Sequence, residues 1–182
     1  MQQTATWLLM YAVLPLLVAA GFVDWLCHRA TAIEATSGLR ESLVHWLMFA
    51  QVGSAIAAVA LFEINAAVLL WVGLVFLLHE VTVWLELRYT VGKREVRPVE
   101  QVVHSFMEML PLVAWALLFV IAQPGDGLRL RRAPLPEGYV FYAALGMLLF
   151  NVLPLAEETV RCVRARRQAR INRHTHPRPA PR

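Results

Sequence analysis

Apolar residues fill this chain in five long runs that short polar segments separate. Each run is close to the ~20 residues that a helix needs to cross the ~30 Å hydrocarbon core of a bilayer. The pattern therefore predicts an all-α integral membrane protein with about five transmembrane helices. The predicted spans cover residues 7–27, 42–62, 65–87, 102–122 and 139–156.

The breaks between the runs carry turn signals. Only a few residues around Glu63 join the second and third spans, so these two helices are expected to form a tight antiparallel pair. The Pro-Gly-Asp-Gly sequence at residues 124–127 is expected to end the fourth helix. Prolines inside the spans are expected to bend their helices, which membrane helices tolerate. These prolines are Pro15, Pro111 and Pro154.

Basic residues are distributed unevenly between the two sides of the predicted bundle. Fourteen of the 17 lysines and arginines fall in the first connection, the third connection and the C-terminal tail. The positive-inside rule then predicts a multi-pass protein of a bacterial-type inner or plasma membrane, with its N-terminus outside and its C-terminus in the cytoplasm. Residues 1–160 form the predicted transmembrane domain, and residues 161–182 form a basic, partly disordered cytoplasmic tail.

Composition supports the membrane class and limits the partners. The chain is 58% hydrophobic and only 16% charged, with a mean hydropathy of +0.53. The net charge of +4 comes from arginines outside the spans. Because no basic patch alternates with exposed aromatics and no phosphate-binding glycine loop appears, no nucleic-acid partner is expected. Membrane lipid is the expected surrounding partner.

A band of ionisable residues lies inside four of the five spans or directly beside them. A bilayer interior excludes such groups, because an unpaired charge or polar atom there costs several kcal/mol. In the predicted topology all of them fall at the cytoplasmic end, within ~10 Å of the inner boundary. Agreement of four helices on one depth indicates a functional site. These residues are Asp24, His28, Glu41, His45, His79, Glu80, Glu100, His104 and Glu108.

Helical spacing brings most of these groups onto shared faces. Asp24 and His28 are four residues apart, as are Glu41 and His45, so each pair lies on one face of its helix. A third helix carries the same spacing twice, in Glu100, His104 and Glu108.

Carboxylates that bridge two cations, with imidazoles that complete each coordination sphere, form dinuclear centres in helical bundles. We therefore interpret all nine residues as metal ligands. We expect two metal ions in a bundle of the first four helices. Iron is the first choice, with zinc and manganese as alternatives. Glu34 lies on the first connection and is the candidate catalytic acid or base, because it can fold over the site from that segment.

In its logic the pattern resembles the non-haem di-iron carboxylate four-helix bundles, although those proteins use Glu-x-x-His and this chain has a spacing of four. It is also similar to membrane fatty-acid hydroxylases and desaturases in placing histidines at the cytoplasmic face, but their histidine boxes are absent. The resemblance implies a di-iron oxidoreductase of the hydroxylase or desaturase type. Such an enzyme acts on an apolar or lipid substrate and receives electrons from a soluble donor.

Four alternatives stay open at this point. A zinc site would suit hydrolysis of a lipid ester or phosphate. A proton- or metal-coupled transporter would use the same groups as an ion pathway, but the outer halves of the spans are nearly free of ionisable residues. A haem protein would use His45 and His104 as axial ligands, yet the clustered acids oppose this. A metal-stapled structural protein, or polar packing without metal, would need no substrate.

Several other polar residues receive a structural interpretation. Glu86, Glu95, Glu157 and Glu158 are expected to be solvated at the membrane interface. Cys27 points away from the face that Asp24 and His28 share, so it is expected to pack rather than to bind metal.

Overall fold

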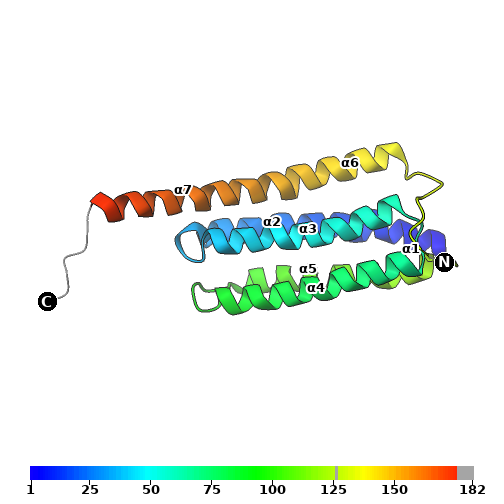
Figure 1. Cartoon of the computed structure of the whole chain (residues 1–182), viewed down its shortest axis with the longest axis horizontal. Helices are drawn as coiled ribbons and strands as arrows, with labels where there is room; N and C mark the ends of the chain where they lie inside the picture. Colours follow the sequence, from blue (N-terminus) through cyan, green and yellow to red (C-terminus); the bar gives the residue numbers. More distant parts are fainter. Residues whose placement is uncertain (126, 176–182) are drawn as a thin grey trace.

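Five long helical rods, arranged antiparallel, make up this protein in a computed structural model (Figure 1). The structure describes residues 1–125 and 127–175, with the backbone alone for residues 173–175. Within these residues there is no strand, only an isolated bridge between Phe62 and Leu130. All five rods are long and apolar enough to cross a membrane. The prediction of an all-helical protein with five helices that can span a membrane is confirmed.

The first and fifth rods each contain a π-helical turn, whereas the middle three are continuous. The first rod comprises α1 (Gln2–Leu8), η1 (Leu9–Val13) and α2 (Leu14–Ala30). The middle rods are α3 (Leu39–Leu61), α4 (Ala66–Thr90) and α5 (Pro98–Ile121). The fifth rod comprises α6 (Glu137–Met147), η3 (Leu148–Val152) and α7 (Leu153–Thr175). A short 3-10 turn, η2 (Ile33–Ala35), lies between α2 and α3.

Both π-helical turns come directly before a Leu-Pro pair, at Pro15 and Pro154. Proline has no amide hydrogen and its ring collides with the preceding turn, and a wider turn relieves both problems. The bends predicted at these two prolines thus take the form of π turns. Pro111 lies inside α5, which is α-helical throughout.

The helices extend past the predicted spans, mainly at one end of the bundle. α2 runs to Ala30, α4 runs to Thr90 and α5 already begins at Pro98. α7 continues through residue 160 to Thr175, because its arginines and alanine are good helix formers. The first part of the predicted tail is therefore helical, and residues 176–182 lie outside the described residues.

The rods pack so that one end of the bundle gathers most of the basic residues. α3 packs against α4 and α7, α2 packs against α5 and α7, and α4 packs against α5. The α2–α3 connection, the α4–α5 connection and the end of α7 share one end of the molecule (Figure 1), which we call the basic end. The N-terminus and the other two connections lie at the opposite, distal end.

Burial is inverted relative to a water-soluble protein. Large apolar side chains face outward, as Leu70 and Leu77 do with 75% and 63% exposure, and a bilayer can accommodate them. A small apolar core of Ile64, Val68, Val72 and Leu118 lies towards the distal end. At the basic end the interior is instead filled by charged and polar side chains, and these form the candidate site.

An extended segment closes the distal end. Asn65 caps α4 by accepting hydrogen bonds from the amides of Ala67 and Val68. The segment after α5 runs back along the end of α3, where the Arg131 amide donates to the Leu61 carbonyl over 2.8 Å. Nη2 of Arg131 donates to the Val59 carbonyl over 2.7 Å, which fixes the guanidinium against α3.

Candidate metal centre

Nine polar side chains meet at the basic end, and we call them the polar cluster. They come from all five rods and from the α4–α5 connection. Helical spacing explains the convergence, because residues four apart on α2, α3 and α5 present one face to the interior. Its members are Asp24, His28, Glu41, His45, Glu86, Arg94, Glu100, His104 and Glu158.

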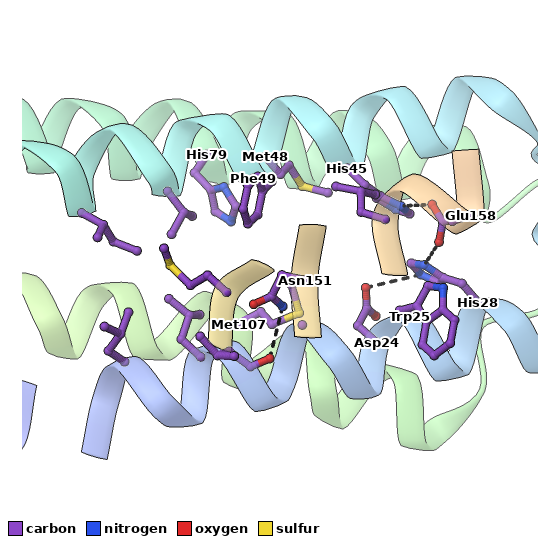
Figure 2. Close-up of a pocket in the computed structure, with 18 residues that line it drawn as sticks. Asp24, Trp25, His28, His45, Met48, Phe49, His79, Met107, Asn151 and Glu158 are labelled. Atoms are coloured by element: carbon purple, nitrogen blue, oxygen red, sulfur yellow. Dashed lines mark hydrogen bonds and ion pairs between the residues drawn. The ribbon is translucent and has the colours of Figure 1, made fainter. Parts of the chain in front are cut away.

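His28 lies at the middle of the cluster and is 1% exposed. Its Nδ1 lies 3.1 Å from a carboxylate oxygen of Glu158 on α7. Its Nε2 faces one oxygen of Asp24 and one of Glu100, each at 3.5 Å, and makes no hydrogen bond within the described residues. The ring stacks on that of His45 with centroids 4.5 Å apart (Figure 2).

Glu158 binds both stacked imidazoles. Its second oxygen lies 3.0 Å from Nδ1 of His45. A carboxylate only accepts hydrogen bonds, so the geometry assigns the Nδ1 proton to both histidines. Each ring then keeps its Nε2 lone pair unless it takes a second proton. This is the arrangement by which carboxylates orient histidines that bind metal ions.

Asp24 connects His28 to His104. One of its oxygens lies 2.9 Å from Nε2 of His104, and the other faces His28. The two oxygens therefore lie between imidazoles of α2 and α5. A short path of ionisable groups joins these two helices at the level of the stacked pair.

Arg94 lies in the α4–α5 connection and points into the cluster, with only 3% of its side chain exposed. It donates two hydrogen bonds to Glu100, at 2.9 and 2.5 Å, and two to one oxygen of Glu41, at 2.7 and 3.2 Å. Burial alone would lower the pKa of this guanidinium, but the hydrogen bonds to Glu100 and Glu41 outweigh it and raise the pKa above its usual value. The second oxygen of Glu41 is buried without a hydrogen-bond partner in the described residues.

Three groups within the cluster have the spacing of metal ligands, with ligand atoms within 4.8 Å of one another. The first group is Asp24, His28, Glu100 and His104; the second is Glu41, His45 and Glu86; the third is His28, His45 and Glu158. The groups adjoin, because His28 and His45 each belong to two of them. Neutral imidazoles and carboxylates in such numbers suit iron, manganese or zinc.

The cluster carries an excess of negative charge. Five carboxylates in it are at least nine-tenths buried, and Arg94 is the only lysine or arginine among the described residues that forms an ion pair with them. With neutral histidines the formal excess is four negative charges, which two divalent cations would balance. Unpaired buried charges are costly, so the cluster needs either cations or protons.

Six of the nine predicted ligands lie in these groups, and three do not. Asp24, His28, Glu41, His45, Glu100 and His104 are the six. His79, Glu80 and Glu108 lie ~6–10 Å further from the basic end along their helices, at 1.5 Å per residue. Figure 2 shows His79 well separated from the stacked pair. The predicted catalytic residue, Glu34, bonds to Arg161 of α7 over 2.5 Å beside the cluster.

The expectation that Glu86 and Glu158 are solvated is wrong. They are 3% and 1% exposed, and Glu158 brings α7 into a site that the sequence placed in four helices only. Glu157 is partly exposed and Glu95 exposed, as predicted. Glu158 could have been predicted from the sequence, because a fifth helix that continues to the arginines places this residue at the depth of His28. Arg94 was also missed, because it lies in a polar segment that the sequence predicts to be a loop.

Cys27 is buried but belongs to none of the ligand groups, in agreement with its predicted packing role. The thiol of Cys162 is buried and unpaired as well.

A mostly apolar cavity of about 120 Å³ leads from the cluster into the bundle (Figure 2). Asp24, His28, His45 and Glu158 line its polar end. Leucine, valine, phenylalanine and three methionines line most of the rest, with His79 and Asn151 further along. His28 and His45 therefore border a mostly apolar cavity. Compared with models of protein families, with curated proteins and with solved structures, the chain shows no match.

Proposed function

We propose that this protein is a membrane-embedded enzyme with a dinuclear metal centre, and that it oxidises an apolar substrate. The Nε2 atom of His28 carries the proposal. Glu158 holds the ring proton of His28 on Nδ1. The lone pair of Nε2 then faces two carboxylate oxygens at 3.5 Å. Such a contact is repulsive unless a proton or a cation lies between, and 3.5 Å is too long for a good hydrogen bond.

The ligand groups suggest one ion in each of two positions. Asp24, His28, Glu100 and His104 would hold the first ion, and Glu41, His45 and Glu86 would hold the second. Glu158 would then orient both histidines without binding metal. Arg94 would offset part of the charge on Glu41 and Glu100. It donates to one oxygen of Glu41 and to both oxygens of Glu100. The second oxygen of Glu41 thus stays free for a cation, whereas Glu100 would bind a cation through a remaining lone pair.

The apolar cavity favours oxidation of a hydrocarbon over hydrolysis. A hydrocarbon bound in such a cavity would place a C–H bond beside the imidazoles. Hydroxylation would take one O₂, two electrons and two protons, and would give the alcohol and one water. The electrons would come from a soluble iron–sulfur or flavin donor. Iron is therefore our first candidate, because zinc has no redox chemistry.

Metal analysis with one matched pair of variants tests the proposal. Glu100→Gln removes a carboxylate of the first ligand group, and Glu108→Gln removes a carboxylate two turns further along the same helix. We expect about two iron ions per chain, without a haem absorption band, in the wild type and in Glu108→Gln. Glu100→Gln should lose most of the metal. Equal metal content in both variants, or a folded wild type without stoichiometric metal, would overturn the proposal.

Zinc-dependent hydrolysis is the second candidate. The ligand set of three imidazoles and several carboxylates suits zinc as well as iron. Two zinc ions in the same analysis, retained when the protein is produced with iron in excess, would move the assignment to a zinc hydrolase. The proposed ligands would keep their roles.

A further inference from the structure

The distal half of the bundle contains a second, larger cavity of about 300 Å³. Protein interiors are close-packed, and voids much larger than one water are few. A partly open cavity of this size, with walls that are mostly apolar, indicates a place for a hydrocarbon ligand. Its polar lining residues are Thr6, His79, Arg131 and Tyr139.

The two cavities adjoin along the axis of the bundle. They share lining residues from four of the rods, and His79 lies at their junction. The shared residues are Leu14, Leu17, Val52, Ile56, His79 and Met147. The two adjoining cavities extend from the polar cluster to the distal end, and we call them together the lumen.

The length of the lumen follows from α3, which lines it throughout. His45 lines the end at the polar cluster, and Arg131 binds the carbonyl of Val59 at the other end. Fourteen residues separate these two positions, so the lumen is about 21 Å long at ~1.5 Å per residue. That is more than half of the ~30 Å hydrocarbon core, and it suits one long extended chain rather than a compact molecule.

Arg131 supplies a cation at the distal end. Its Nε is buried without a hydrogen-bond partner, and no carboxylate among the described residues pairs with it. The two hydroxyls nearby are already used, since Thr6 bonds to the Gln2 carbonyl and Tyr139 to the Met10 carbonyl. A guanidinium held in this way recognises a carboxylate.

We propose that the lumen binds one long-chain fatty acid, with its carboxylate on Arg131 and its hydrocarbon chain directed past His79 towards the polar cluster. The single cation favours the singly charged carboxylate. The chain end remote from the carboxylate would reach the imidazoles. That the centre then oxidises this end rests on the proposed function, whereas binding does not.

Binding is tested on the protein as isolated, by titrating the detergent-purified chain with hexadecanoic acid or its methyl ester under native mass spectrometry. We expect one acid molecule per chain, bound about tenfold more tightly than the ester, because the ester lacks the charge that Arg131 recognises. Arg131→Gln should reduce acid binding to the level of the ester, and Arg131→Lys should retain most of the preference. Arg132→Gln, at an exposed neighbour that pairs with Glu63, is the matched control and should bind like the wild type.

A second variant tests the direction of the chain. Val52 lines both cavities, and Val52→Phe should narrow the lumen between them. With the carboxylate on Arg131, a short chain would still fit in the distal cavity, whereas a long chain would meet the new ring. We therefore expect this variant to prefer octanoic over hexadecanoic acid while it still prefers acids over esters.

Two results would overturn the inference. One is equal binding of acid and ester to the wild type, which needs no variant to fold and would assign the lumen to bulk lipid. The other is acid binding that Arg131→Gln leaves unchanged. Metal content, measured separately, keeps the two proposals apart, because a chain that binds hexadecanoic acid through Arg131 but holds no metal would contradict only the proposed function.

Discussion

His28 and His45 stack face to face, with ring centroids 4.5 Å apart and planes inclined by 7°, and Glu158 binds Nδ1 of both rings. The three residues come from three different rods. One carboxylate thus sets the tautomer and the orientation of both imidazoles, and it leaves both Nε2 atoms for other partners.

Glu158→Gln should therefore weaken one of the two metal positions. A glutamine amide has one accepting oxygen and one donating nitrogen, so one of the two histidines must move its proton to Nε2. That histidine loses its ligating lone pair, and loss of an orienting partner of this kind typically weakens metal binding 10- to 100-fold. Metal content measured against a graded series of chelators checks this.

The neighbouring residue provides the control. Glu157 is partly exposed, and it pairs with Arg29 and Arg161 at the edge of the bundle. Glu157→Gln should leave metal affinity unchanged. Equal loss in both variants would mean that Glu158 acts through general stability rather than through the histidines.

Arg94 should be essential for stability when metal is absent. Its removal leaves Glu41 and Glu100 buried without their guanidinium, and breaking a buried pair by deleting one partner costs about 3–5 kcal/mol. We expect Arg94→Gln to lower the unfolding temperature strongly in the metal-free protein and less in the metal-loaded protein, where cations take over part of the compensation. Thermal unfolding in detergent, with and without metal, measures both.

Arg97→Gln is the control for this prediction, because Arg97 is exposed in the same connection. It should unfold like the wild type. Equal destabilisation of Arg94→Gln with and without metal would indicate that ions and guanidinium do not share the same carboxylates.

The sequence predicts the rods and six of the nine members of the polar cluster, for a physical reason. Span length and apolar composition are local properties, and a spacing of four places Asp24 beside His28 whatever the neighbouring helices do. The depth argument also works for residues that lie at helix ends, such as Glu41 and Glu100.

What the sequence does not predict depends on tertiary contacts. Glu158 and Arg161 both lie near the end of the last hydrophobic run, yet one turns inward to two histidines and the other pairs with Glu34. Arg94 lies in a polar connection, and only the fold of that connection directs it inward. Periodicity cannot show which way a terminal turn or a loop points.

Two glycines on neighbouring helices should respond oppositely to alanine. A Cβ on Gly73 of α4 would lie 2.7 Å from the Trp115 ring, which cannot swing away easily because its Nε1 bonds to the Leu69 carbonyl. Overpacking of this kind costs ~1–3 kcal/mol. A Cβ on Gly53 of α3 meets nothing within 4 Å, so alanine there should stabilise the helix by ~0.5–1 kcal/mol. Thermal unfolding of both variants checks the signs, and a stabilised Gly73→Ala would contradict the close packing of α4 on α5.

Metal removal should destabilise the wild type but not a chain that lacks a ligand. A metal that binds only the folded state at 1,000 times its dissociation constant adds about 4 kcal/mol of stability, and a strong chelator removes it. We expect the chelator to lower the unfolding temperature of the wild type and of Glu80→Gln, whose carboxylate lies outside the ligand groups. Asp24→Asn should show no further decrease. This variant has already lost the first metal position, and the second position adjoins the first through the stacked His28 and His45 rings. The comparison uses the shift within each variant, so any direct effect of the substitution on stability cancels. A wild type whose unfolding temperature stays constant while its metal is removed would show that protons and Arg94, not metal ions, balance the carboxylates.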